Sequence, residues 1–181
     1  KALKDQQISS MVESLGTLLR ATLSNKKPLV SLDYEIGLAG SYMTIQKIRF
    51  EDRLLFHVEC PEELGKALIL PLTIQPLLEN AIRYGMEEMM DTCEISIRTR
   101  KEGTLLIVEV SNEGSVFEDG LLEKLQDGTK NAHGFGIGLV NIHQRIQMLF
   151  GDSYGLSFKN QDEKAIAIIT IPYKTEEDDY A

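Results

Sequence analysis

Three short segments of the sequence combine residue types that could bind a charged ligand. The first runs from Leu77 to Gly85, where Asn80, Arg83 and Tyr84 would share one face of a helix because they lie three and four residues apart. That face would offer an amide oxygen to a hard cation, a guanidinium to phosphate and a ring for stacking. Taken alone, the segment is more typical of an ordinary amphipathic helix with a polar edge. Its core-facing positions would be Ile74, Leu77, Leu78, Ala81 and Gly85.

The second segment, Val110 to Gly114, stands at the end of a predicted strand and before a long polar stretch. Ligand-binding groups are often found where a strand passes into a loop, so Asn112 and Gly114 are candidates. The alternative is a plain turn, because Asn and Gly favour turns for conformational reasons alone.

The third segment has alternating glycines, Gly134, Gly136 and Gly138, followed by Leu139 and a predicted helix. Glycines let backbone amides approach an anion, and the start of a helix adds positive potential. Leu139 stands where a dinucleotide-binding fingerprint needs glycine, and no Gly-Lys-Ser/Thr follows as in a Walker loop. A flexible loop before a helix is the alternative interpretation.

Apolar spacing predicts the elements that position these segments. An amphipathic helix is expected over residues 1–24, and Ser31 is a plausible N-cap of a second helix that faces inward with Ile36, Ala39, Met43 and Ile48. Further helices are expected over 71–85, 118–126 and 138–150. Strands are expected over 54–60, 94–100, 105–110, 156–159 and 165–173. The pattern predicts a helical hairpin followed by an α+β sandwich.

Composition argues against several classes of function and site. The chain of 181 residues carries 19 basic and 28 acidic side chains, a net charge of −9 that argues against binding to nucleic acid. Cys60 and Cys93 lack the spacing of a zinc site and are expected to be free, half-buried thiols. No apolar run reaches the length of about 18 residues that a membrane helix needs. Because the chain starts without Met inside a helical pattern, we expect it to be cut from a longer protein.

Together and in this order, the three segments resemble the ATP-binding domain of histidine kinases, whose superfamily includes gyrases and heat-shock chaperones. The stretches SYMTIQKIRF (41–50) and LTIQPLLENAI (72–82) are similar to the LytS/YesM-type sensor histidine kinases of bacteria. The resemblance extends over residues 10–173. It implies a two-layer α/β sandwich, with a mixed sheet covered on one face by helices. The implied divisions are a helical segment and connector over 1–52, the ATP-binding domain over 53–174 and an acidic tail over 175–181.

The resemblance also implies roles for the candidate residues. Asn80 would ligate the Mg²⁺ that bridges the ATP phosphates, Arg83 would contact phosphate and Tyr84 would line the pocket. Asn112 would accept a hydrogen bond from the adenine amine, and Gly114 would let the chain pass close to the base.

The glycine segment would cradle the phosphates and hinge a lid. In this resemblance Gly134, Gly136 and Gly138, with Leu139 beside them, form the nucleotide-binding box. Residues 115–133 would be the lid, from which Lys130 and His133 could reach phosphate.

The activity implied is a protein-histidine kinase that uses ATP and Mg²⁺. It would transfer the γ-phosphoryl group to a histidine on an upstream helix, for onward transfer to an aspartate of a response regulator. His57, His133 and His143 are outside any acceptor motif, so the acceptor helix is missing and this fragment should not autophosphorylate. The intact protein would be a homodimer and a bacterial inner-membrane sensor, of which this chain is a cytoplasmic portion without membrane contact of its own.

The sequence departs from the family pattern at three positions. Asn112 stands where the family has aspartate, Val116 replaces a second glycine, and Tyr84 is often histidine in this branch. These departures leave open a second interpretation, a degenerate nucleotide-binding or non-catalytic interaction module of the same fold. A hydrolase is disfavoured because Pro76 stands where related ATPases carry their general base, and no catalytic residue is assigned.

Overall fold

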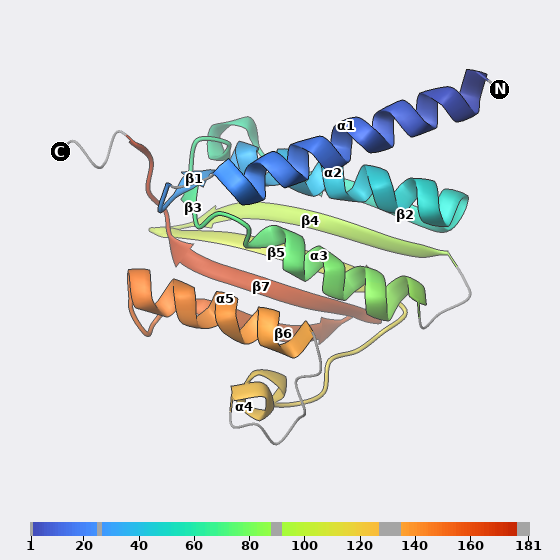
Figure 1. Ribbon diagram of the computed structural model, residues 1–181. Helices are drawn as coiled ribbons and strands as arrows, with labels where there is room; N and C mark the ends of the chain where they lie inside the picture. Colours follow the sequence, from blue (N-terminus) through green and yellow to red (C-terminus); the bar gives the residue numbers. More distant parts are fainter. Residues whose placement is uncertain (1, 25–26, 88–91, 127–134, 177–181) are drawn as a thin grey trace.

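A computed structural model describes residues 2–24, 27–87, 92–126 and 135–176. Its centre is a five-stranded sheet in the order β2-β4-β5-β7-β6, drawn in Figure 1. The parallel pair β2–β4 and the antiparallel pairs that follow make this sheet mixed, as expected. The strands are β2 (Leu54–Glu59), β4 (Cys93–Glu102), β5 (Leu105–Glu113), β6 (Gly155–Gln161) and β7 (Lys164–Pro172).

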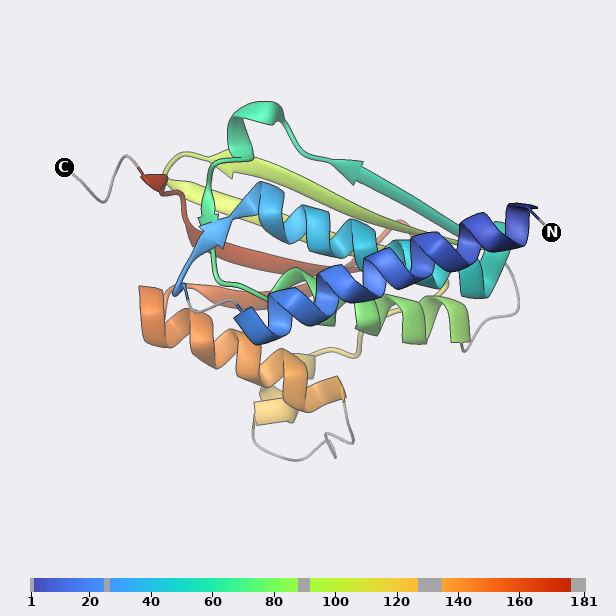
Figure 2. The same cartoon turned by 45° about the horizontal axis from the view of Figure 1, so that its top comes forward.

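Helices cover one face of this sheet (Figures 1 and 2). Those on the sheet are α2 (Leu32–Phe50), α3 (Ile74–Ile82) and α5 (Phe135–Phe150). The long helix α1 (Ala2–Ser24) packs on α2 and forms the expected hairpin, while the short α4 (Leu121–Gln126) lies against α5. Two-residue strands β1 (Val30–Ser31) and β3 (Leu68–Ile69) pair beside the hairpin, and single turns η1 (Glu51–Arg53) and η2 (Glu62–Leu64) complete the connections.

The core lies between the sheet and these helices. Alternate residues of the strands point inward, and the predicted apolar face of α3 is confirmed because all of its members are buried. Residues of α2 belong to the same core, so α2 packs as part of the sandwich. The central buried side chains include Met43, Ile74, Leu77, Leu78, Ile95, Ile97, Leu106, Ile146, Ile169 and Ile171.

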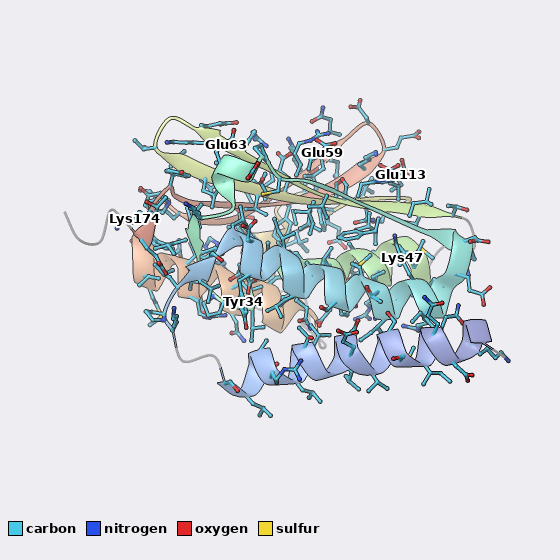
Figure 3. The ribbon with its side chains drawn as sticks, turned by 90° about the horizontal axis from the view of Figure 1, so that it is seen from above. Tyr34, Lys47, Glu59, Glu63, Glu113 and Lys174 are labelled. Atoms are coloured by element: carbon cyan, nitrogen blue, oxygen red, sulfur yellow. The ribbon has the colours of Figure 1, made fainter. Side chains whose placement is uncertain are left out.

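The opposite face of the sheet is polar. Arg98 donates to Glu59 across β4 and β2, and Lys164 lies 3.3 Å from Glu94. Figure 3 shows Glu59 and Glu113 on the strands, well away from α1, which is the outermost helix. Such ion pairs keep a sheet face hydrated at little gain in stability.

Three helices begin at other residues than expected. The short α4 begins at Leu121 instead of Glu118. α3 begins at Ile74 instead of Pro71, because Leu72 adopts a left-handed backbone with φ of 58° and interrupts the turn. α5 begins at Phe135 instead of Gly138, so Gly136 and Gly138 are helical. Glycine costs about 1 kcal/mol in a helix, and burial of Leu139, Ile142 and Ile146 on the same helix offsets that cost.

The remaining expectations concern single residues. Ser31 caps α2, since its hydroxyl accepts from the Tyr34 N–H at 3.2 Å. His57 is exposed. Both cysteines are free as expected, but only Cys60 is half-buried, because Cys93 lies fully inside the core.

The surface of α1 carries an unpaired apolar stripe. Its members lie three and four residues apart and are 50% to 78% exposed: Ile8, Val12, Leu15, Leu19 and Leu23. No helix in the described ranges combines the length and the apolar character needed to cross a membrane.

Candidate nucleotide-binding site

Helix α3 and the π-helical turn η3 (Arg83–Glu87) that continues it position the first group of candidate residues. Asn80 is 4% exposed, and its side-chain amide makes no hydrogen bond to another described residue. Arg83 and Tyr84 are half-buried next to it, with Cζ of Arg83 5.7 Å from the centroid of the Tyr84 ring. Among the described residues only Oε1 of Gln46 is a fully buried side-chain atom without a partner, so the Asn80 amide keeps contact with solvent and is accessible to a ligand.

Asn112 is held in one orientation at the end of β5. Its Nδ2 donates to the Glu113 carbonyl at 3.0 Å and to the Ser115 hydroxyl at 2.7 Å. A carbonyl oxygen can only accept, so the atom that faces it must be the amide nitrogen. The oxygen Oδ1 therefore points the other way, where it can accept a hydrogen bond from a ligand.

Gly85 brings these two groups together. A β-carbon at this position would lie 3.2 Å from Nδ2 of Asn112 and 2.6 Å from the sulfur of Cys93. Only glycine lets η3 approach β5 this closely. Burial raises the pKa of the Cys93 thiol, which donates to the Glu113 carbonyl and fills the space beneath the site as a neutral group.

The chain after β5 turns away at Gly114 and is then tied to β6. Gly114 has a φ of 79°, which fits the expected turn. Asn160 accepts from the Phe117 N–H and donates to the Phe117 carbonyl, both at 2.8 Å, so the predicted lid is anchored near its start. Val116, between Gly114 and Phe117 in the sequence, is 69% exposed.

The glycine-containing helix start forms a third side. Gly136 and Gly138 lie in the first turn of α5, whose N–H groups have no partner within the helix. A β-carbon at Gly138 would meet nothing within 4 Å among the described residues. Leu139 is 3% exposed, so its side chain packs under the helix start. Gly134, Lys130 and His133, with the lid beyond residue 126, lie outside the described residues.

The donor set fits Mg²⁺ better than a transition metal. Among the described residues no three His, Cys, Asp or Glu side chains gather into a metal-binding group. Mg²⁺ commonly takes one or two protein oxygens and completes its shell with water and phosphate. The amide oxygen of Asn80 is a donor of the type that Mg²⁺ accepts.

Two contacts that sequence reasoning missed hold α3 in place. Glu35 of α2 accepts hydrogen bonds from the N–H groups of Leu72, Thr73 and Ile74, and Arg145 of α5 donates to the Pro71 carbonyl. Neither belongs to a local motif, so no signal in the sequence links them to residues 71–74. Glu79 of α3 accepts a hydrogen bond from the side-chain amide of Gln75 at 2.9 Å.

Comparison with protein families gives two matches in sequence. The family described as histidine kinase matches residues 1–54, and the one described as histidine kinase-, DNA gyrase B-, and HSP90-like ATPase matches residues 65–175. The sensor histidine kinase YesM of Bacillus subtilis is 41% identical over 97% of this chain, and BtsS of Escherichia coli is 31% identical over 94%. The chain spans only 30% and 29% of these relatives.

Solved structures show the same fold at low identity. The catalytic domain of the histidine kinase ThkA superposes with a TM-score of 0.62 at 19% identity, covering 81% of this chain and 99% of that domain. ThkA in complex with the response regulator protein TrrA superposes with a TM-score of 0.57, covering 92% of this chain and 49% of the kinase chain.

Proposed function

Because the chain belongs to the histidine kinase-, DNA gyrase B-, and HSP90-like ATPase family, with sensor histidine kinases as its relatives, we propose that it supplies the ATP site of a protein-histidine kinase. This proposal depends on two side-chain amides, Asn80 on α3 and Asn112 near the end of β5. Asn80 has an amide that makes no hydrogen bond to another described residue, and Asn112 has an oxygen directed away from the Glu113 carbonyl.

These residues would bind MgATP in a defined orientation. Asn80 would give an oxygen to Mg²⁺, which neutralises phosphate charge when bound. Arg83 would add a positive charge from the same helix, and Tyr84 would border the pocket. At the other end, Oδ1 of Asn112 would accept from the adenine amine while Gly114 turns the chain aside.

The phosphate end would lie at the start of α5. Gly136 and Gly138 would leave room for a phosphate oxygen near the N–H groups of the first turn. We propose the same role for Gly134, with Leu139 supporting the turn from the core.

Catalysis would consist of positioning and charge neutralisation, because phosphoryl transfer asks little covalent chemistry of the protein. The nucleophile would be a histidine on an upstream helix. Pro76 in the first turn of α3 cannot accept a proton from water, which suits a transferase.

The partners and location are also proposals. The exposed stripe of α1 would be covered in a homodimer of the intact protein, and the phosphoryl group would pass to an aspartate of a response regulator. We place this segment, divided near residues 52 and 53 into a helical part and an ATP-binding part, on the cytoplasmic side of a bacterial membrane sensor.

Phosphoryl transfer in trans tests the proposal. The chain is mixed with radiolabelled ATP, Mg²⁺ and a longer form of the same protein that includes the upstream helix and carries Asn80→Ala. We expect acid-labile label on the longer form and none on the chain alone. Stable labelling of the chain at His57 or His143, or phosphate release without an acceptor, would contradict it.

A further inference from the structure

The N-terminus of α3 is capped by a residue of another helix. Its own N-cap residue, Thr73, makes no capping hydrogen bond, because its hydroxyl donates to the Leu70 carbonyl at 2.7 Å. The first turn of α3 also contains no acidic residue, and Pro76 has no N–H. The helix on which Asn80 stands therefore has no local means of satisfying its first N–H groups.

Glu35 of α2 supplies the missing acceptor. Its Oε1 accepts from the Leu72 N–H at 2.7 Å, and its Oε2 accepts from the N–H groups of Thr73 at 2.9 Å and Ile74 at 3.2 Å. The side chain is 1% exposed. Hydrogen bonds from N–H groups to a carboxylate are among the stronger ones in proteins, and the negative charge lies at the positive end of the α3 dipole.

The turn at residues 71–74, which Glu35 binds, contains a strained residue and is also held by α5. Leu72 has a φ of 58°, a conformation that a leucine keeps only when its surroundings fix it. Arg145 of α5 donates to the Pro71 carbonyl at 3.0 Å, and its charge lies near Glu35. Burial raises the pKa of the Glu35 carboxyl, and the three N–H donors and Arg145 oppose that rise. The turn thus joins α2, α3 and α5.

We propose that Glu35 is a positioning residue that couples the N-terminal helical segment to the nucleotide site through α3. Asn80 lies six residues after Ile74 on one continuous helix, so a change at the capped end moves the amide. Because α1 packs on α2, a displacement of the hairpin would reach Asn80 by this route. The proposal rests on the nucleotide site proposed above.

The test replaces Glu35 by Gln and compares it with Asp33→Asn. Asp33 is an exposed acid of the same helix turn that lies against Gly65 and not against α3, so it is a matched control. Gln keeps the shape of Glu but turns one acceptor into a donor facing N–H groups. We expect Glu35→Gln to weaken binding of a non-hydrolysable ATP analogue with Mg²⁺ at least about fivefold, and Asp33→Asn to change it less than about twofold.

Hydrogen exchange of the backbone amides at the start of α3 and in the turn before it is measured on the same samples. Coupling is reciprocal, so nucleotide should protect the amides of Leu72, Thr73 and Ile74 in the parent chain, and Glu35→Gln should abolish that gain. Unchanged affinity in a folded Glu35→Gln variant would reduce Glu35 to a structural cap and overturn the proposal.

Two further measurements keep the outcomes separate. If Glu35→Gln does not fold, Arg145→Gln replaces it, because that side chain is exposed and holds the same turn; affinity equal to the parent would then overturn the coupling. If the parent chain binds no nucleotide, the proposed function fails. In that case hydrogen exchange of the Asn80 and Arg83 amides tests the coupling by itself. Exchange rates that Glu35→Gln leaves unchanged would show that Glu35 does not influence the part of α3 that carries Asn80.

Discussion

Gly85 lies directly against Asn112, so close that a β-carbon on residue 85 would be 3.2 Å from Nδ2 of that asparagine. The same β-carbon would lie 2.6 Å from the Cys93 sulfur, well inside contact distance. The helix that carries Asn80 and the strand that carries Asn112 therefore meet at a position where no side chain fits. The geometry of the two ends of the proposed pocket depends on this contact.

Gly85→Ala should destabilise the fold by about 1–3 kcal/mol, since overpacking forces a shift of the buried neighbours. Urea unfolding measures the effect. Gly37→Ala is the control, because a β-carbon there meets nothing within 4 Å among the described residues and alanine favours helix. Equal stability of Gly85→Ala and the parent chain would show that the two elements do not meet as described.

Asn112 should select adenine over guanine. Its free Oδ1 can accept from the amino group of adenine, whereas guanine presents a carbonyl oxygen at that position. Asn112→Ala should reduce the preference for ATP over GTP about tenfold, equivalent to about 1.4 kcal/mol. Competition binding with both nucleotides measures this ratio.

Asn112→Asp tests whether the Glu113 carbonyl fixes the orientation of the Asn112 amide. The family pattern suggests that a charge would strengthen the bond to adenine, but a carboxylate would place an oxygen 3.0 Å from the Glu113 carbonyl. We therefore expect Asn112→Asp to lower stability. An Asp variant as stable as the parent would mean that the amide orientation is not fixed by Glu113.

His143 should make stability dependent on pH. Its Nδ1 accepts from the Leu156 N–H at 3.0 Å, and burial lowers the pKa of His143 below its usual 6.5. A lowered pKa means that the unfolded chain binds the proton more readily. The stabilising contribution is thus present above pH 6.5 and is lost as pH falls from there to the folded pKa.

Unfolding of His143→Asn at several pH values checks this dependence. The Asn oxygen can accept the same hydrogen bond and does not titrate, so stability should fall less between pH 7 and pH 5, about the range in which histidine titrates. His57→Asn serves as the control because His57 is exposed. If the two variants and the parent share one pH profile, His143 is not the group responsible.

Much of this architecture could be predicted because the spacing of apolar residues indicates which positions are buried. The alternation in β7 and the apolar face of α3 follow directly from which positions face the sheet. The ligand-binding candidates were found because their residue types are unusual together. The paired strands β1 and β3 were missed, since two residues carry no period.

The tertiary contacts could not be predicted for a different reason. Glu35 has the spacing of an ordinary helical acid, and only the fold shows that it caps a helix 37 to 39 residues later. Likewise, Gly85 was assigned to the core-facing side of its helix, but its contact with Asn112 depends on how α3 crosses β5.

The apolar stripe of α1 predicts self-association. Burying side chains such as Val12 and Leu19, which are 64% and 54% exposed, would contribute roughly 1.5–3 kcal/mol each. Sedimentation over a range of concentrations should show a dimer that Val12→Lys with Leu19→Lys removes. Met148→Lys, on the 87% exposed Met148 of α5, should leave it intact. A chain that is monomeric throughout would contradict the prediction.

Calorimetric titration of the chain and of Asn80→Ala with a non-hydrolysable ATP analogue, with and without Mg²⁺, tests whether Asn80 holds the metal of a bound nucleotide. We predict that the parent chain binds, that Mg²⁺ strengthens binding, and that Asn80→Ala removes most of the Mg²⁺-dependent part. Binding that is equal in Asn80→Ala, or no binding by the parent chain, would contradict the proposed ATP site and favour a non-catalytic module of the same fold.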